Sequence, residues 1–202
     1  FLKFGREDAV RIAYAVGADF DTIADIDRVL PPLLQGMDAV ALRETKCLEK
    51  VRQCAPGIPV TTVIDPTLLL DKEAYRDIQP DEPLETEPFI FTYTMPNDTQ
   101  KTVYQAALQL GEKLNLKVID ASGQPNRAHH AIADHRTCSP AQFLWYMDHA
   151  SYVLTNSFHG TAFSVIMEKQ FFVIPHSKTG NRAVDMLERM PELFWNLADN
   201  RP

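Results

Sequence analysis

Short apolar segments with the composition of buried strands alternate with helical segments along most of the chain. Apolar runs that end in glycine or polar residues are typical of inner strands in a parallel sheet. This alternation predicts βαβ units and an α/β fold. We expect strands at residues 11–17, 39–42, 60–64, 89–93, 117–120, 152–154 and 171–174. We expect helices at residues 23–34, 44–54, 100–114, 140–150, 158–168 and 182–190.

A proline-rich and acidic stretch at residues 71–88 interrupts the alternation. Such a composition is typical of a linker between domains. The sequence therefore predicts two Rossmann-like domains joined by a linker at residues 76–88. In this interpretation residues 1–75 are the C-terminal part of an incomplete first domain, and residues 89–202 form the second.

Length, charge and cysteine content exclude several classes of protein. With 202 residues, 45% of them hydrophobic, the chain has enough apolar material for a globular core. The formal charge of −7 argues against nucleic acid as a partner. No apolar run reaches the roughly 18–20 residues that cross a bilayer, so we expect no integral membrane segment. The three cysteines form no paired pattern, which favours a reducing, cytoplasmic location.

The segment from Tyr152 to Ser164 reads as a buried strand, a tight turn and the first turns of a helix. A helix that starts directly after a strand directs backbone N–H groups and a positive dipole end at one point, which suits an anion. His159 stands at that point as a candidate proton donor. Ser157 is the expected N-cap, and Gly160 and Thr161 are candidate binding residues beside it. The alternative is that His159 only caps its own helix.

Two polar residues follow strands in the first half of the chain. Arg43 comes directly after the strand at residues 39–42 and could bind a carboxylate or phosphate with two hydrogen bonds. Alternatively, Arg43 pairs with Glu44 or with an acid of the other domain. Asp65 precedes Pro66 after the next strand, where we favour a turn held by side-chain hydrogen bonds.

Two further groups of polar residues follow strands in the second half. Lys178 and Arg182 open the last predicted helix and could bind an anion, or could simply start a solvated helix. A loop also gathers three histidines and a cysteine, but it lacks the paired spacing of zinc ligands, so we predict a polar loop without metal. These residues are His129, His130, His135 and Cys138.

Taken in order, these segments resemble the polysaccharide pyruvyl transferase family over most of the chain. The matching pieces are Tyr14-Ala15, Ala41-Leu42-Arg43-Glu44, Asp65-Pro66-Thr67-Leu68-Leu69-Leu70, Ile90-Phe91-Thr92-Tyr93, Phe143-Leu144-Trp145, Thr155 to Ser164, and Asn181-Arg182. Family residues in the SFHG-like and SxRE-like motifs correspond to His159 and Arg43. Ala41 departs from the family pattern, which often has serine at that place.

The resemblance implies two Rossmann-like domains in a GT-B-like arrangement, with the active site in the cleft between them. It also implies transfer of pyruvate from phosphoenolpyruvate onto two hydroxyls of a sugar, giving a cyclic ketal on a cell-surface polysaccharide or its lipid-linked precursor. Phosphoenolpyruvate would be the donor substrate, with no separate cofactor. The protein would act in the cytoplasm or at the inner face of the membrane.

Family members usually begin with a glycine-rich segment that this sequence lacks, so we expect roughly a hundred or more preceding residues in the intact protein. Two rival functions share these sequence features. One is a GT-B glycosyltransferase that uses a nucleotide sugar. The other is a catalytically silent, carbohydrate-binding relative.

Overall fold

The computed structural model describes residues 6, 8–17, 23–122, 134–135, 137–176 and 181–189. The chain divides into two compact units, residues 1–69 and residues 70–202. Both units contain parallel β-sheets with helices beside them, which confirms the predicted Rossmann-like α/β class.

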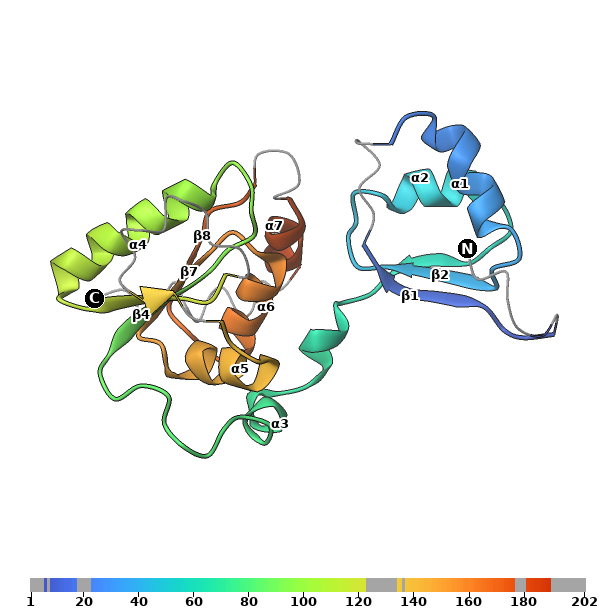
Figure 1. Ribbon diagram of the computed structural model, residues 1–202. Coiled ribbons are helices and arrows are strands. Elements are labelled where there is room, and N and C mark those ends of the chain that lie inside the picture. Colours follow the sequence, from blue (N-terminus) through green and yellow to red (C-terminus); the bar gives the residue numbers. More distant parts are fainter. Residues whose placement is uncertain are drawn as a thin grey trace. The chain divides into compact units, whose positions relative to one another are not determined.

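The first unit contains a three-stranded parallel sheet with the order β1-β2-β3. Val40 lies in the middle of the sheet, opposite Ala13 on one side and Val60 on the other. Two helices lie on one face of the sheet (Figure 1) and enclose a core with Val40, Leu42 and Val51. The elements are β1 (Ile12–Val16), α1 (Ile26–Leu34), β2 (Ala39–Leu42), α2 (Leu48–Cys54), β3 (Val60–Thr62) and a 3₁₀ turn (Pro66–Leu69).

The second unit is built on a five-stranded parallel sheet with the order β6-β5-β4-β7-β8. Successive side chains of its central strand β4 point to opposite faces. Phe89 and Phe91 pack with α5, while Ile90 packs with α4, so that both faces are covered (Figure 1). The strands are β4 (Phe89–Tyr93), β5 (Lys117–Asp120), β6 (Asp134–His135), β7 (Tyr152–Thr155) and β8 (Phe171–Val173). The helices are α3 (Lys72–Arg76), α4 (Gln100–Leu114), α5 (Pro140–His149), α6 (Phe158–Ile166) and α7 (Asn181–Glu188).

Most predicted elements are present, with differences at their ends. The sequence analysis missed three short elements: the 3₁₀ turn, helix α3 and strand β6. Helix α2 begins at Leu48 rather than at Glu44, because Glu44 is buried beside Arg43 and the chain turns before the helix starts.

The predicted linker packs against the second unit. Helix α3 precedes it and is capped by Asp71, whose carboxylate accepts a hydrogen bond from the Ala74 N–H (3.0 Å). Further along, the carboxylate of Glu85 lies 2.7 Å from Nζ of Lys117 on β5, and Leu84 packs against the core beneath α5. Composition does not reveal such long-range partners, and the linker bounds stay a prediction.

Candidate active site

The strand order of the second unit defines a place where ligands bind in folds of this kind. Numbered within the unit, the strands lie in the order 3-2-1-4-5. The connections from neighbouring strands β4 and β7 therefore leave in opposite directions, and open α/β sheets bind ligands outside the carboxyl ends of such strands. The loops that follow β4, β7 and β8 meet at these carboxyl ends. We refer to this side of the sheet as its carboxyl edge.

Asn156 joins the loop after β7 to the loop after β4. Its Oδ1 accepts a hydrogen bond from the Met95 N–H (2.7 Å), and its Nδ2 donates to the Met95 carbonyl (3.0 Å) and to Oδ1 of Asn97 (2.7 Å). Asn156 is 8% exposed, so these bonds are shielded from water. Sequence reasoning gave Asn156 no role, although its position directly after a buried strand was a usable signal.

The loop after β8 is attached to the same edge. Thr99 donates from Oγ1 to the carbonyl of Ile174 (3.3 Å). His176 follows, and its Nε2 lies 3.3 Å from Oδ1 of Asp98, within ion-pair distance. Sequence analysis singled out neither His176 nor Asp98, although each follows a strand closely.

Helix α6 begins at this edge with the predicted N-cap. The Ser157 side chain accepts a hydrogen bond from the Gly160 N–H (3.3 Å), which confirms the capping prediction. Thr161 is fully buried, and its Oγ1 donates to the Ser157 carbonyl (2.9 Å). His159 lies in this first turn with an exposed side chain, its ring 5.2 Å from that of Phe158. The arrangement presents an imidazole to solvent at the positive end of a helix.

Gly160 allows α6 to lie close to β7. A Cβ atom at this position would come within 3.0 Å of Cβ of Thr155 and still closer to its hydroxyl. The Thr155 hydroxyl in turn donates to the Tyr93 carbonyl and accepts from the Ser157 N–H. Close helix–strand packing therefore explains the glycine, and the roles of Ser157, Gly160 and Thr161 toward a substrate stay predictions.

Arg43 belongs to the first unit, at the carboxyl end of β2. Its Nη1 lies 2.8 Å from Oδ2 of Asp65, and its Nε lies 3.4 Å from Oε1 of Glu44. Both carboxylates are nearly fully buried, whereas the Arg43 side chain is 20% exposed. Gly17 makes room for the guanidinium, since a Cβ there would lie 2.8 Å from Nη2. The pairing with Glu44 that we considered is therefore present, and the two carboxylates hold the guanidinium in one orientation.

Asp65 also holds the turn that the sequence predicts. Its Oδ1 accepts hydrogen bonds from the N–H (3.0 Å) and the hydroxyl (2.8 Å) of Thr67. One carboxylate thus fixes both a turn and Arg43. The second task was not apparent from the sequence, because 22 residues separate Asp65 from Arg43.

The structure describes only some of the remaining predicted residues. Arg182 is partly buried in the first turn of α7, a helix that packs against α6. Lys178, His129 and His130 lie outside the described residues, as does the side chain of His135. Among the residues that the structure describes, no three histidine, cysteine or carboxylate side chains are grouped to hold a metal ion. Burial, followed by the charge of Asp120, raises the pKa of the Cys138 thiol.

A network of buried polar side chains holds the carboxyl ends of β4 and β5. Asp120 ends β5 with no exposed surface, and its Oδ1 accepts hydrogen bonds from the hydroxyls of Thr92 (2.8 Å) and Ser122 (2.6 Å). The Ser122 Oγ also accepts from the Thr94 N–H (2.8 Å). Tyr104 on α4 joins the network, and burial raises its pKa. The network fixes the point at which the chain leaves β4, because its members come from β4, β5 and α4.

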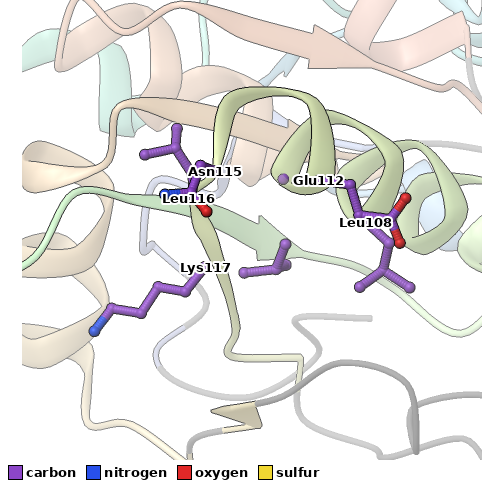
Figure 2. Close-up of a pocket in the computed structure, with 7 residues that line it drawn as sticks. Leu108, Glu112, Asn115, Leu116 and Lys117 are labelled. Atoms are coloured by element: carbon purple, nitrogen blue, oxygen red, sulfur yellow. The ribbon is translucent and has the colours of Figure 1, made fainter.

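Two hollows, one among the described residues of each unit, do not coincide with these polar clusters. In the second unit a hollow of about 310 Å³ lies beside Asn115, Leu116 and Lys117, at the amino end of β5 (Figure 2). In the first unit a cavity of about 410 Å³ is lined by apolar core side chains such as Leu30 and Met37. The first hollow has one cationic residue in its lining, Lys117, whose Nζ pairs with Glu85 (2.7 Å) and Glu87 (3.1 Å), and the lining of the second has none. We therefore locate the candidate site from the strand ends.

The parallel sheets and the polar clusters at their carboxyl ends define a Rossmann-like α/β protein. A family model described as polysaccharide pyruvyl transferase matches residues 1–178. The chain belongs to this family, as the motifs in its sequence predicted. A search of curated proteins finds no match. Within the described part of the chain, every helix is too short or too polar to span a membrane.

Proposed function

We propose that this protein transfers a pyruvyl group from phosphoenolpyruvate onto two hydroxyls of a saccharide, forming a cyclic ketal on a polysaccharide or its lipid-linked precursor. Membership of the pyruvyl transferase family supports the reaction class. The observation that carries the proposal is the exposed imidazole of His159 in the first turn of α6, at the carboxyl edge of the sheet. The donor supplies the reactive group, so the proposed chemistry uses no further cofactor. We place the reaction in the cytoplasm, where phosphoenolpyruvate is available.

His159 acts as the acid in this proposal. Phosphoenolpyruvate is an enol ester, so a proton added to its methylene carbon creates a cationic centre at the neighbouring carbon that a sugar hydroxyl attacks. The protonated imidazole donates that proton. The N-terminus of α6 attracts the donor's phosphate or carboxylate, because the helix dipole and its first N–H groups favour negative charge.

Arg43 binds the anionic donor in this proposal. Asp65 and Glu44 hold its guanidinium in place before any ligand arrives, which reduces the entropy lost on binding. The guanidinium is a planar group that matches a carboxylate or phosphate, and a fifth of the side-chain surface is exposed. Arg182 and Lys178 are further candidates for donor binding, with Ser157, Gly160 and Thr161 shaping the helix end.

The test combines phosphoenolpyruvate with methyl glycosides of galactose, glucose and mannose and measures phosphate release, with ketal formation followed by NMR. His159→Ala should lower turnover by about 10²- to 10⁴-fold, the usual contribution of a positioned acid. The fold should persist, because the side chain is exposed. Lys113→Ala, an exposed change at the far end of α4, serves as the matched control. Unchanged turnover in His159→Ala would end the acid assignment.

For Arg43 the informative substitution is lysine rather than alanine. Removing the cation would take a positively charged partner from two buried carboxylates and destabilise the fold. Arg43→Lys keeps the charge but cannot make a bidentate contact with the donor, so KM for phosphoenolpyruvate should rise more than kcat falls. An unchanged KM would count against donor binding by Arg43.

The rival functions are separated by ligand response. Phosphoenolpyruvate should raise the melting temperature of a protein that binds it, by mass action. The melting temperature of a nucleotide-sugar enzyme should instead rise with a nucleoside diphosphate, and that of a silent relative with neither ligand.

A further inference from the structure

We propose that His176, held by Asp98, is the base that removes the proton from the acceptor hydroxyl. The inference rests on the proposed pyruvyl transfer and deepens it by assigning a second proton-transfer group. Its basis is a carboxylate–imidazole pair at the carboxyl edge of the second unit, where Nε2 of His176 lies 3.3 Å from Oδ1 of Asp98.

The pair is formed by two loops that leave different strands. Asp98 lies in the loop after β4, and His176 lies in the loop after β8. Asn97 and Thr99 flank Asp98; Asn97 accepts a hydrogen bond from Asn156, and Thr99 donates to the carbonyl of Ile174. Hydrogen bonds that do not involve the pair therefore hold the chain on both sides of Asp98 and shortly before His176.

This geometry suits a general base. A carboxylate beside one ring nitrogen favours the tautomer with its proton on that nitrogen, which here is Nε2. The lone pair then lies on Nδ1, which is the atom that would accept a proton. A base oriented by a third group is the arrangement found in activated nucleophile systems. The His176 side chain is 22% exposed, so an acceptor hydroxyl can reach it.

The reaction needs such a group in addition to an acid. In the first step the acceptor oxygen bonds to the central carbon of phosphoenolpyruvate, the double-bond electrons take a proton from His159, and His176 takes the hydroxyl proton. In the second step the bond to the phosphate oxygen breaks with its electron pair. The second hydroxyl oxygen bonds to the same carbon, and its proton passes to the departing phosphate. The products are the ketal and inorganic phosphate, and the proton on His176 returns to His159 through solvent.

The location of His176 fits this division of labour. Strand β8 pairs with β7, so the loop that carries His176 and the helix that carries His159 follow neighbouring strands at the same edge of one sheet. His159 sits in a helix N-terminus, which favours anions, whereas His176 lies beside a carboxylate. A neutral hydroxyl is the better partner for a group whose neighbour is already negative.

The test compares His176→Gln and Asp98→Asn with the unchanged protein in the methyl glycoside assay. His176→Gln should lower kcat by about 10²- to 10⁴-fold while the melting-temperature response to phosphoenolpyruvate persists. Asp98→Asn should lower kcat in the same direction. The kcat of the double variant should be no lower than that of His176→Gln alone, because the two residues act as one unit.

A second measurement separates a base from a structural residue. The acceptor is exchanged for an analogue in which fluorine replaces a hydroxyl that neighbours the ketal-forming pair, located by NMR, but takes no part in the ketal; the fluorine makes the neighbouring reacting hydroxyl more acidic. A more acidic hydroxyl depends less on a base for its deprotonation. The fold-decrease in kcat caused by His176→Gln should therefore be smaller on the fluorinated acceptor. If His176→Gln does not fold, Asp98→Asn carries the same comparison.

Full activity of both variants on the unfluorinated acceptor would overturn the inference and leave the proposed function standing. An equal fold-decrease in kcat on both acceptors would also overturn the inference, because the effect of a structural defect does not depend on the acidity of the hydroxyl. Failure of the unchanged protein to release phosphate would overturn the proposed function, and the inference with it.

Discussion

At the level of single residues, the contact between Gly160 and Thr155 sets how closely α6 approaches β7. Thr155 makes hydrogen bonds to both Tyr93 and Ser157, so its side chain has little freedom to move away from a larger neighbour. The turn that carries His159 therefore depends on a residue without a side chain. His159 and Gly160 are adjacent in sequence, but His159 is the candidate acid, whereas Gly160 sets the distance between helix and strand.

We predict that Gly160→Ala lowers the free energy of unfolding by about 1–3 kcal/mol, because the added methyl group overlaps Thr155. Urea denaturation measures the change. In a Thr155→Ala background the same substitution should cost less, since the overlapping hydroxyl is gone. Equal costs in the two backgrounds would show that Thr155 is not the obstacle.

The candidate residues differ in how far the sequence reveals them. Arg43 directly follows β2, and His159 lies in the helix that begins shortly after β7, so their location near strand ends is a local property. Asn156, Asp98 and His176 also follow strands closely, but their importance comes from partners far along the chain. Asn156 is 61 residues from Met95, and no local pattern contains that pairing.

At the level of elements, α3 shows how a surface-like segment becomes part of a folded unit. Arg76 makes two hydrogen bonds to the carboxylate of Asp148 on α5 (2.7 and 3.0 Å). Tyr75 meets the ring of Phe163 on α6 edge to face at 5.1 Å. These contacts attach α3 to the helices that cover one face of the sheet.

The Arg76–Asp148 pair predicts how acid affects stability. Burial alone raises the pKa of Asp148, but the hydrogen bonds and charge of Arg76 outweigh it, so the pKa lies below its ordinary value. A carboxyl with a lowered pKa stabilises the fold above the unfolded value of about 3.9. That stability is lost as the pH falls through the folded pKa.

We therefore expect the unfolding free energy to fall more steeply below about pH 4 in the unchanged protein than in Asp148→Asn. Chemical denaturation at several pH values measures the slopes. Glu49→Gln is the matched control, because it removes only an exposed partner of Arg52. Identical slopes for Asp148→Asn and the unchanged protein would refute the role of the pair.

At the level of the whole molecule, the chain consists of two units with separate cores. The core clusters of the second unit draw on residues from Tyr75 to Ile174, and the cluster of the first unit on residues from Ala13 to Val60. The five strands that the structure describes in the sheet of the second unit all come from residues 89–173. Each unit thus contains the apolar contacts that a folded domain requires.

We predict that a fragment of residues 70–202 unfolds cooperatively on its own, as followed by circular dichroism. The matched fragment of residues 77–202 lacks α3 and should melt at a lower temperature, because it loses Tyr75 and Arg76. Equal melting temperatures would show that α3 contributes nothing to the second unit. Loss of cooperative unfolding in residues 70–202 would contradict an independent core.

The sequence by itself determined the α/β class, most strands and helices, the N-cap at Ser157 and the family. These features depend on periodicity, capping and motifs, which are properties of near neighbours in the chain. Only the tertiary structure decided which strand ends meet, that Asp65 and Glu44 hold Arg43, and that Asp98 faces His176. The physical reason is that strand order brings distant loops together, and the gain from packing and hydrogen bonding selects that order over many others with the same local pattern.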